Sequence, residues 1–199
     1  MRPPDPRDTS APPVIVWLAE WTRRKDAIFA AIASQSGGGR RLPLIGLSFR
    51  NFPETQERAA AALAVAKRQP RGRLGRALKR ALIAAQYNWS RRFFTRQPGA
   101  VAVCWNGLTG SRRAFIEGAR DAGAGRLYAE LAPFPGRITL DPLGVNAQNA
   151  LPRDPGFYRD WAAADPARQG EGWRALGANL TARASRRADV GQGDGDALA

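Results

Sequence analysis

Apolar and polar residues follow two periods along the chain, and the two periods alternate. Short runs of apolar, often β-branched residues, such as PVIVWLAEW and AVAVCWNG, are typical of buried strands. Between them, apolar residues recur every three or four positions, as in helices with one buried face. The predicted strands cover residues 13–21, 42–49, 100–107, 126–133 and 138–141, and the predicted helices cover residues 23–36, 54–67, 71–97, 109–123 and 154–163. This alternation predicts an α/β fold, a single Rossmann-like domain with a mostly parallel sheet flanked by helices.

The two ends of the chain differ from this patterned region. The start, MRPPDPRDTSAPP, is rich in proline and charge, and the end, ASRRADVGQGDGDALA, is small, polar and without periodicity. We therefore expect one domain over residues 13–165, between disordered tails at 1–12 and 166–199. No apolar run reaches the ~20 residues that cross a bilayer, so a cytoplasmic protein is expected.

The helix predicted over residues 71–97 combines a basic surface with an apolar stripe. Leu74, Leu78, Leu82, Trp89 and Phe93 recur at helical spacing, while the arginines lie on other faces. Three interpretations remain open: the helix lies on an anionic membrane, binds nucleic acid, or packs its stripe on the sheet and exposes its arginines to water. The residues that would contact a membrane are Arg76, Lys79, Arg80, Trp89, Arg91, Arg92, Phe93 and Phe94.

The composition shows an uneven distribution of charge and excludes several kinds of catalytic and metal site. The net charge is +14, and residues 58–116 contain lysines and arginines but no Asp or Glu, which favours phosphate-rich or otherwise acidic partners. A single cysteine, Cys104, excludes an internal disulfide framework. The absence of histidine excludes Ser-His-Asp chemistry and removes the commonest metal ligand. We expect neither a metal site nor a bound cofactor.

A glycine-containing turn follows the strand predicted over residues 100–107. The sequence WNGLTGSRR places Asn106 and Gly107 at the end of a strand, and Ser111 and Arg112 in the first turn of a helix. Backbone amides at such a helix start can hold a phosphate or carboxylate, so these four residues are candidates for substrate binding. The alternative is a tight turn that needs its glycines for backbone reasons alone. Neither a P-loop nor a dinucleotide-binding glycine motif is present.

Two carboxylates stand out in the stretch AELAPFPGRITLDPLGVNAQNALPR. Glu130 ends one predicted strand and Asp141 ends the next, and a rigid Pro-Phe-Pro-Gly corner joins them. Because ligands of open α/β sheets bind beyond the carboxyl ends of strands, the two carboxylates can face one ligand as a catalytic pair. The alternative is structural, with Glu130 paired to an arginine such as Arg137 and Asp141 capping the turn Asp-Pro-Leu-Gly.

The same segments resemble the capsule polysaccharide biosynthesis and export proteins, which include β-Kdo glycosyltransferases of Gram-negative bacteria. The resemblance covers about residues 101–158 and rests on VAVCWNG, LYAELAPFPG and ITLDPLGVN, with Glu130, Asp141 and Gly144 at the matching motif positions. It implies one half of a GT-B fold and transfer of Kdo, or a related acidic sugar, from a CMP-sugar to a glycolipid or glycan acceptor at the inner membrane.

The resemblance also implies roles for individual residues. Asp141 would be the nucleophile or cation stabiliser, and Glu130 the acid/base partner. Arg137 or Arg153 would pair with the carboxylate or phosphate of the donor, and Asn146 and Asn149 would hydrogen-bond sugar hydroxyls.

The sequence departs from the family in ways that leave the activity open. The family's enzymes have two Rossmann-like halves, whereas 199 residues provide for one, and the ELAPFPG corner replaces the usual acidic, glycine-containing turn. A second glycosyltransferase subunit could supply the other half, or the chain could bind glycan without turnover or serve assembly of the capsule machinery. The alternative function is a non-catalytic basic module that binds anionic lipid or, with less motif support, nucleic acid.

Overall fold

A computed structural model of the chain describes residues 12–20, 22–132, 136–164 and 178. The predicted tails lie outside this part, except for Pro12 and Ala178. The described residues divide into two compact units, and each is considered by itself. The first holds the residues up to Ala132 together with Arg137–Pro152, and the second includes helix α5 (Pro155–Ala164), close to the last helix predicted from the sequence.

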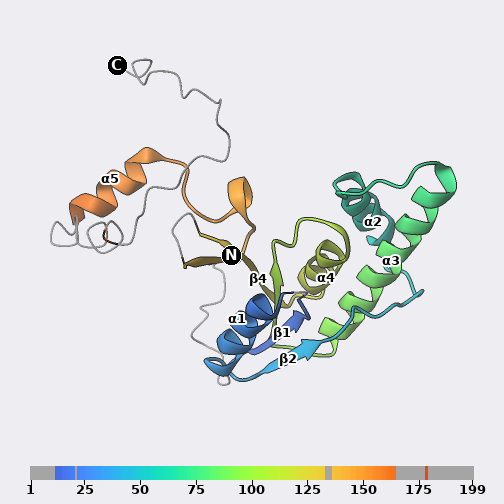
Figure 1. The fold of residues 1–199 in the computed structure, drawn as a ribbon, viewed down its shortest axis with the longest axis horizontal. Helices are drawn as coiled ribbons and strands as arrows, with labels where there is room; N and C mark the ends of the chain where they lie inside the picture. Colours follow the sequence, from blue (N-terminus) through green and yellow to red (C-terminus); the bar gives the residue numbers. More distant parts are fainter. Residues whose placement is uncertain (1–11, 21, 133–135, 165–177, 179–199) are drawn as a thin grey trace, which may run out of the picture. The chain divides into compact units, whose positions relative to one another are not determined.

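The first unit is built on one five-stranded sheet with the strand order β2-β1-β3-β4-β5 (Figure 1). Its strands are β1 (Val14–Leu18), β2 (Gly39–Leu42), β3 (Ala100–Trp105), β4 (Gly125–Leu131) and β5 (Ile138–Asp141). The first four run parallel, whereas β5 is antiparallel to β4. This is the mostly parallel, helix-flanked α/β sheet that the alternating pattern predicted.

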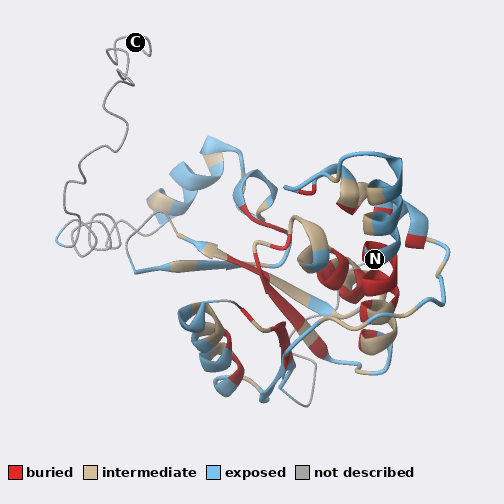
Figure 2. Cartoon of the chain, turned by 45° about the vertical axis from the view of Figure 1, so that its right-hand side comes forward, coloured by how far each residue is buried: buried red, intermediate tan, exposed pale blue. Residues whose placement is uncertain are grey.

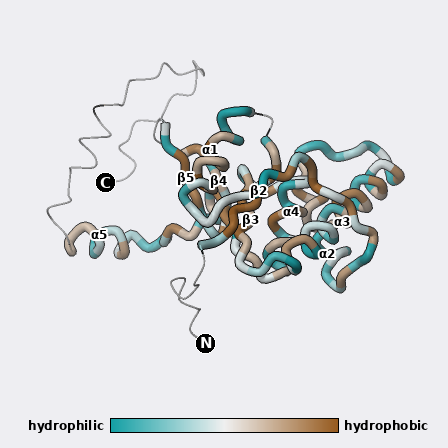
Figure 3. The backbone as a smooth tube through the Cα atoms, turned by 90° about the horizontal axis from the view of Figure 1, so that it is seen from below, coloured by the Kyte–Doolittle hydropathy of each residue, from teal (hydrophilic) through white to brown (hydrophobic). Residues whose placement is uncertain are grey.

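Helices cover both faces of the sheet, so alternate residues of the central strands enter two cores. Helix α1 (Arg23–Ser34) packs Phe29 on one face, against Ile15 and Trp17. Helices α3 (Arg73–Thr95) and α4 (Gly110–Asp121) cover the other face, and α2 (Thr55–Ala64) packs against both of them. Figure 2 shows the buried residues gathered in the central strands and the helices beside them, and Figure 3 shows how apolar β3 is.

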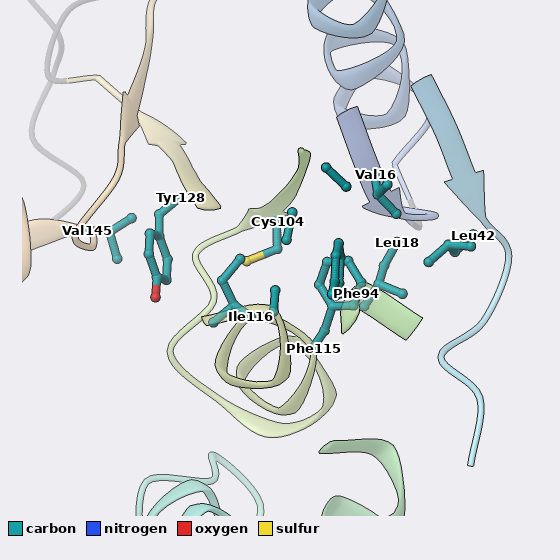
Figure 4. Packing of buried hydrophobic residues seen from close by; sticks show 12 residues of the cluster. Val16, Leu18, Leu42, Phe94, Cys104, Phe115, Ile116, Tyr128 and Val145 are labelled. Carbon is teal, nitrogen blue, oxygen red and sulfur yellow. The ribbon is translucent and has the colours of Figure 1, made fainter. Parts of the chain in front are cut away.

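The larger core lies between the sheet and the α3–α4 layer. Val16 and Leu18 from β1 meet Phe94 from α3 and Phe115 from α4 there (Figure 4). The rings of Phe94 and Phe115 are 5.3 Å apart in an edge-to-face arrangement. Phe94 is only 1% exposed, so its predicted contact with a membrane is wrong. Trp89 and Phe93, predicted for the same role, are partly buried against this core and stack on each other.

The strand predicted over residues 42–49 is wrong, because β2 ends at Leu42, where that strand was expected to begin. Pro43 follows, and proline has no N–H to donate to a neighbouring strand. The next residues run along α3 instead: the Ser48 N–H donates to the Ala85 carbonyl over 2.9 Å. Gly46 lies so close to Trp89 that a Cβ there would be 2.3 Å from the indole nitrogen.

The apolar stripe predicted for α3 is buried only in its second half. Leu74, Leu78 and Leu82 are 74%, 64% and 47% exposed. A helix of 23 residues is about 35 Å long, whereas a six-residue strand spans about 20 Å, so α3 is too long for the sheet to cover. The interpretation in which the whole apolar stripe packs on the sheet is therefore wrong for these three leucines.

A charged cluster joins α2, α3 and α4 beside the core. The Asp121 carboxylate accepts hydrogen bonds from Arg58 over 2.8 Å, from the Tyr87 hydroxyl over 2.8 Å and from Arg120 over 3.1 Å. Burial acts to raise the pKa of Asp121, but these hydrogen bonds outweigh it and the pKa is lowered. Burial, together with the hydrogen bond to Asp121, raises the pKa of Tyr87 to about 12.

Candidate ligand site at the carboxyl end of the sheet

The strand order reverses between β1 and β3, which lie side by side although β2, α2 and α3 separate them in the chain. Open α/β sheets bind ligands in the crevice that such a reversal creates beyond the carboxyl ends of the strands. A pocket of ≈ 520 Å³ lies at this place. Its lining comes from the end of β1 (Leu18, Ala19), the segment after β2 (Pro43, Leu44, Ile45, Leu47), α3 (Leu82, Gln86) and the start of α4 (Thr109, Ser111, Arg112).

The turn between β3 and α4 leads into the helix start that lines this pocket. Asn106 and Gly107 both have positive φ, of 68° and 69°. A Cβ at Gly107 would lie 2.7 Å from the Tyr128 ring and 2.8 Å from the Cys104 sulfur, so the backbone needs glycine here. The Asn106 side chain accepts the Leu108 N–H, as in an Asx turn. These two predicted substrate-binding residues shape the turn, whereas Ser111 and Arg112 line the pocket.

An ion pair between a half-buried arginine and a buried carboxylate lies beside the pocket. The Glu20 side chain is 3% exposed and accepts a hydrogen bond from Arg112 over 2.5 Å. Burial raises the pKa of Glu20, and Arg112 and Lys25 offset only part of this effect. Thr109 makes no side-chain hydrogen bond to cap α4, so the helix start adds partial positive charge without competition from its own cap. With Arg112 balanced by Glu20, the pocket suits a ligand that offers both hydroxyl donors and acceptor oxygens.

Gln86 is a polar lining residue of the pocket whose side-chain oxygen lacks a hydrogen-bond partner among the described residues. It is 8% exposed, and its Oε1 atom is buried without a hydrogen-bond partner in the part of the chain that the structure describes. A buried acceptor without a partner costs about 1–3 kcal/mol. Because Gln86 lines the pocket, rotation of its amide would bring Oε1 to a ligand hydroxyl or N–H and recover this cost. Gln86 was not among the residues predicted from the sequence to bind substrate. The available signal was an amide in the otherwise apolar run LIAAQY.

Glu130 and Asp141 lie near each other, but not at parallel strand tips. Because β5 is antiparallel, Asp141 at its carboxyl end pairs with Tyr128, two residues before Glu130. Side chains at these diagonal positions share one face of the sheet. The premise that both carboxylates project beyond the same strand ends is therefore wrong, although they do share a face.

Both carboxylates bind the backbone of the loop after β5. Asp141 accepts the N–H groups of Leu143, Gly144 and Ala150 over 2.8, 3.0 and 2.8 Å. Glu130 accepts the N–H of Asn146 over 3.1 Å. This is the turn-capping role that the sequence offered for Asp141, and Glu130 serves the same loop. Neither carboxylate lines the pocket at the strand reversal.

The other predicted substrate residues are spread over both units. Asn146 has a positive φ of 54°, Asn149 accepts the Leu151 N–H through its side chain, and the Arg137 carbonyl accepts the Ala132 N–H. Arg153 belongs to the second unit, so its position relative to this site is not described. The structure therefore brings Ser111 and Arg112 to one pocket, and Glu130, Asp141 and Asn146 to one loop.

Several charged residues predicted to contact a membrane instead make contacts within the first unit. Lys79 donates to the Arg68 carbonyl, and Arg80 donates to the Gln56 carbonyl over 3.4 Å, so both tie α3 to the α2 region. Arg91 pairs with Glu54 and lies over the Phe52 ring. Arg76 is exposed beside them, and Arg92 lines a second pocket. None of the helices in the described ranges has the length and apolar character of a membrane span.

Comparison with known proteins gives one partial match. Seventy-five residues of the chain are 31% identical to Protein FixF of Sinorhizobium fredii (strain NBRC 101917 / NGR234). The match covers 38% of this chain and 16% of that protein. No protein-family model matches the chain, and no solved structure matches it.

Two further observations limit the chemistry of the described residues. No group of three or more Cys, Asp or Glu side chains in the described ranges is placed to hold a metal ion. Cys104 is buried in the core, and burial raises the pKa of its thiol to about 12, so a Cys104 thiolate is not available at neutral pH.

Proposed function

We propose that the chain is a glycosyltransferase-like component of capsular polysaccharide biosynthesis that binds a CMP-activated acidic sugar, such as Kdo, in the pocket at the strand reversal. The observation that supports this most directly is the pocket itself, which joins apolar walls for a ring to Ser111, the α4 start and the unpartnered acceptor of Gln86. The resemblance of residues 101–158 to capsule proteins supplies the reaction class.

In this proposal, the residues at the pocket bind and orient the sugar nucleotide. The α4 amides and Ser111 face the phosphate or carboxylate of the donor, and Gln86 accepts a hydrogen bond from a hydroxyl. Glu130 and Asp141 hold the loop after β5 in shape, and any catalytic use of them requires that the loop amides release them. A second glycosyltransferase subunit at the inner face of the membrane contributes further active-site residues, and the acceptor is a glycan or glycolipid.

Binding of CMP-Kdo by the purified chain tests the proposal. We expect calorimetry to detect binding, and Gln86→Leu to weaken it about tenfold, because a leucine leaves a ligand hydroxyl without its acceptor. Gln35→Leu, on an exposed glutamine at the end of α1, is the matched control and should bind as the wild type does. Absence of CMP-Kdo binding, or equal binding by Gln86→Leu, would contradict the proposal. Asp141→Asn with unchanged CMP release in the presence of an acceptor would leave Asp141 a structural role only.

A second candidate function is a non-catalytic module that binds anionic lipid. The observation that favours it is the exposed leucine row Leu74, Leu78 and Leu82 on a helix without acidic residues. Exposed Leu44 and Leu47 share a pocket with Leu82 and extend the apolar surface. Interfacial helices bury such rows among lipid chains and keep their arginines at the head groups, whereas nucleic acid would contact the arginines alone.

Vesicles of anionic lipid provide the test for this candidate. We expect Leu78→Glu to reduce co-sedimentation with phosphatidylglycerol vesicles at least fivefold, since a carboxylate replaces an apolar side chain in the contact. Leu143→Glu adds the same charge at an exposed leucine outside α3 and should have little effect. If duplex DNA displaces the vesicles and Leu78→Glu binds them normally, the lipid function is contradicted.

A further inference from the structure

A second pocket, of ≈ 310 Å³, lies between the last turns of α3 and the segment that precedes α2. Three arginines line it: Arg50 from the segment, Arg92 from the last turn of the helix, and Arg96 from its C-cap position. Phe52 and Pro53 add an apolar wall. This pocket shares no lining residue with the one at the strand reversal, so it is a separate site.

The three arginines differ from Arg58, Arg91 and Arg112 in their ionic contacts. Within the part of the chain that the structure describes, none of them forms an ion pair. The acidic residue nearest in the sequence to the pocket wall, Glu54, is engaged by Arg91 instead. Arg92 and Arg96 are four residues apart on one helix, where like charges repel each other. An anion between them would replace this repulsion with attraction.

A buried hydrogen-bond network holds the segment that carries Arg50. Asn88 is 1% exposed; it accepts from the Thr55 hydroxyl over 2.5 Å and donates to Asn51 over 3.0 Å and to the Ser48 carbonyl over 3.2 Å. The Phe52 N–H donates to the Thr55 hydroxyl oxygen over 2.8 Å. Both sides of Arg50 in the chain are therefore fixed to α3, and a preformed site loses less entropy on binding than a mobile one.

We propose that this pocket binds a phosphoryl group. Guanidinium groups present paired N–H donors that match phosphate oxygens, and three cations exceed the charge of a single carboxylate but suit a phosphate dianion or a pyrophosphate. The Asn51 amide accepts from Asn88 through its oxygen, which leaves its nitrogen as a further donor at the pocket. The apolar wall of Phe52 and Pro53 accommodates the body that carries the phosphate. The inference does not depend on the function proposed for the other pocket.

The same chemistry can come from a soluble phosphate ester or from a lipid head group, so the test has two arms. Calorimetry with pyrophosphate measures the soluble source, and co-sedimentation with phosphatidic acid in phosphatidylcholine vesicles measures the lipid source. Binding in the first arm alone assigns a soluble ligand, and binding in the second arm alone assigns a head group. Either result supports the site, whereas binding in neither arm overturns it.

Two double variants on α3 decide whether the arginines of this pocket are responsible. We expect R92A/R96A to weaken binding about 100-fold, because two charged hydrogen-bonding groups are lost. With pyrophosphate as the ligand, R76A/R80A is the control: it also removes two positive charges four residues apart on α3, and it should change binding less than about twofold if the anion is held in the pocket and not by general charge. Equal losses in the two variants would overturn the proposal.

A variant that keeps both charges tests the proposal even if the alanine variant does not fold. R92K/R96K keeps both positive charges and loses the paired donors, so binding should weaken about tenfold. Circular dichroism and the urea midpoint of each variant establish that it is folded. If R92A/R96A does not fold, wild-type affinity in R92K/R96K by itself contradicts recognition by paired donors.

Discussion

Replacing Phe94 with alanine is expected to lower the free energy of unfolding by about 3–5 kcal/mol. Phe94 is almost fully buried, and its ring packs edge-to-face against Phe115 from α4 and Phe93 from its own helix. The substitution removes the apolar contacts and leaves a cavity between α3, α4 and the sheet. Urea denaturation followed by circular dichroism measures the loss.

Phe49→Ala is the matched control for this experiment. The Phe49 side chain is 84% exposed, so its removal should change the unfolding free energy by less than about 0.5 kcal/mol. Similar losses in the two variants would mean that Phe94 is not in the core. A Phe94→Ala protein of normal stability but reduced lipid binding would restore the membrane role first expected for this residue.

Replacing Asp121 with alanine is expected to cost about 3 kcal/mol at pH 7, because the positive charge of Arg58 and the Tyr87 hydroxyl lose their shared acceptor. The cost should depend on pH. The pKa of Asp121 is lowered in the folded protein, so its contribution is fully present above the pKa of the unfolded chain, which is about 3.9. It is lost as the pH falls through the lower, folded value.

Unfolding curves at pH 7, 5 and 3 measure this dependence. The difference between wild type and Asp121→Ala should be similar at pH 7 and 5 and smaller at pH 3. Asp160→Ala, on an exposed residue of α5, is the control and should be nearly neutral throughout. A difference that grows as the pH falls would contradict the lowered pKa.

The local apolar pattern predicted the strands correctly where the apolar residues are buried on both faces of the sheet. The runs VIVWL and AVAVCW are apolar throughout because both lie in the middle of a parallel sheet, covered on both faces. The segment after Leu42 was predicted as a strand on the same grounds. Its residues are mostly apolar, as in a buried strand, but Pro43 and the contact of Gly46 with Trp89 place it along a helix. Such long-range contacts leave no trace in local periodicity.

Strand direction also lay beyond the sequence pattern. ITLD was predicted as a strand, and it is one, but the residues of the strand itself do not distinguish a parallel from an antiparallel edge strand. The short link between β4 and β5 was the available signal, because parallel strands need a crossover of a dozen or more residues. Because β5 runs antiparallel to β4, Glu130 and Asp141 do not project beyond the same strand ends. Both instead accept hydrogen bonds from the backbone of the loop after β5.

The candidate site was predicted only where a local motif formed it. Ser111 and Arg112 follow a strand-to-helix turn, so the sequence indicated them and the pocket includes them. Gln86 and Glu20 reach the same region from α3 and from the end of β1, and only the packing of three separate segments brings them together. The arginines of the second pocket were visible as charges, but their convergence depends on the buried Asn88 network.

The length of α3 has a consequence for its stability along the chain. Its second half is fixed by the sheet, α4 and the buried Asn88, whereas its first turns extend past the strands with exposed leucines. One continuous helix therefore combines a segment that opens only when the whole unit unfolds with a segment whose local opening costs far less free energy. Backbone amide hydrogens near Leu74 should exchange with solvent through fraying of the helix end, whereas those near Phe94 should exchange only through global unfolding.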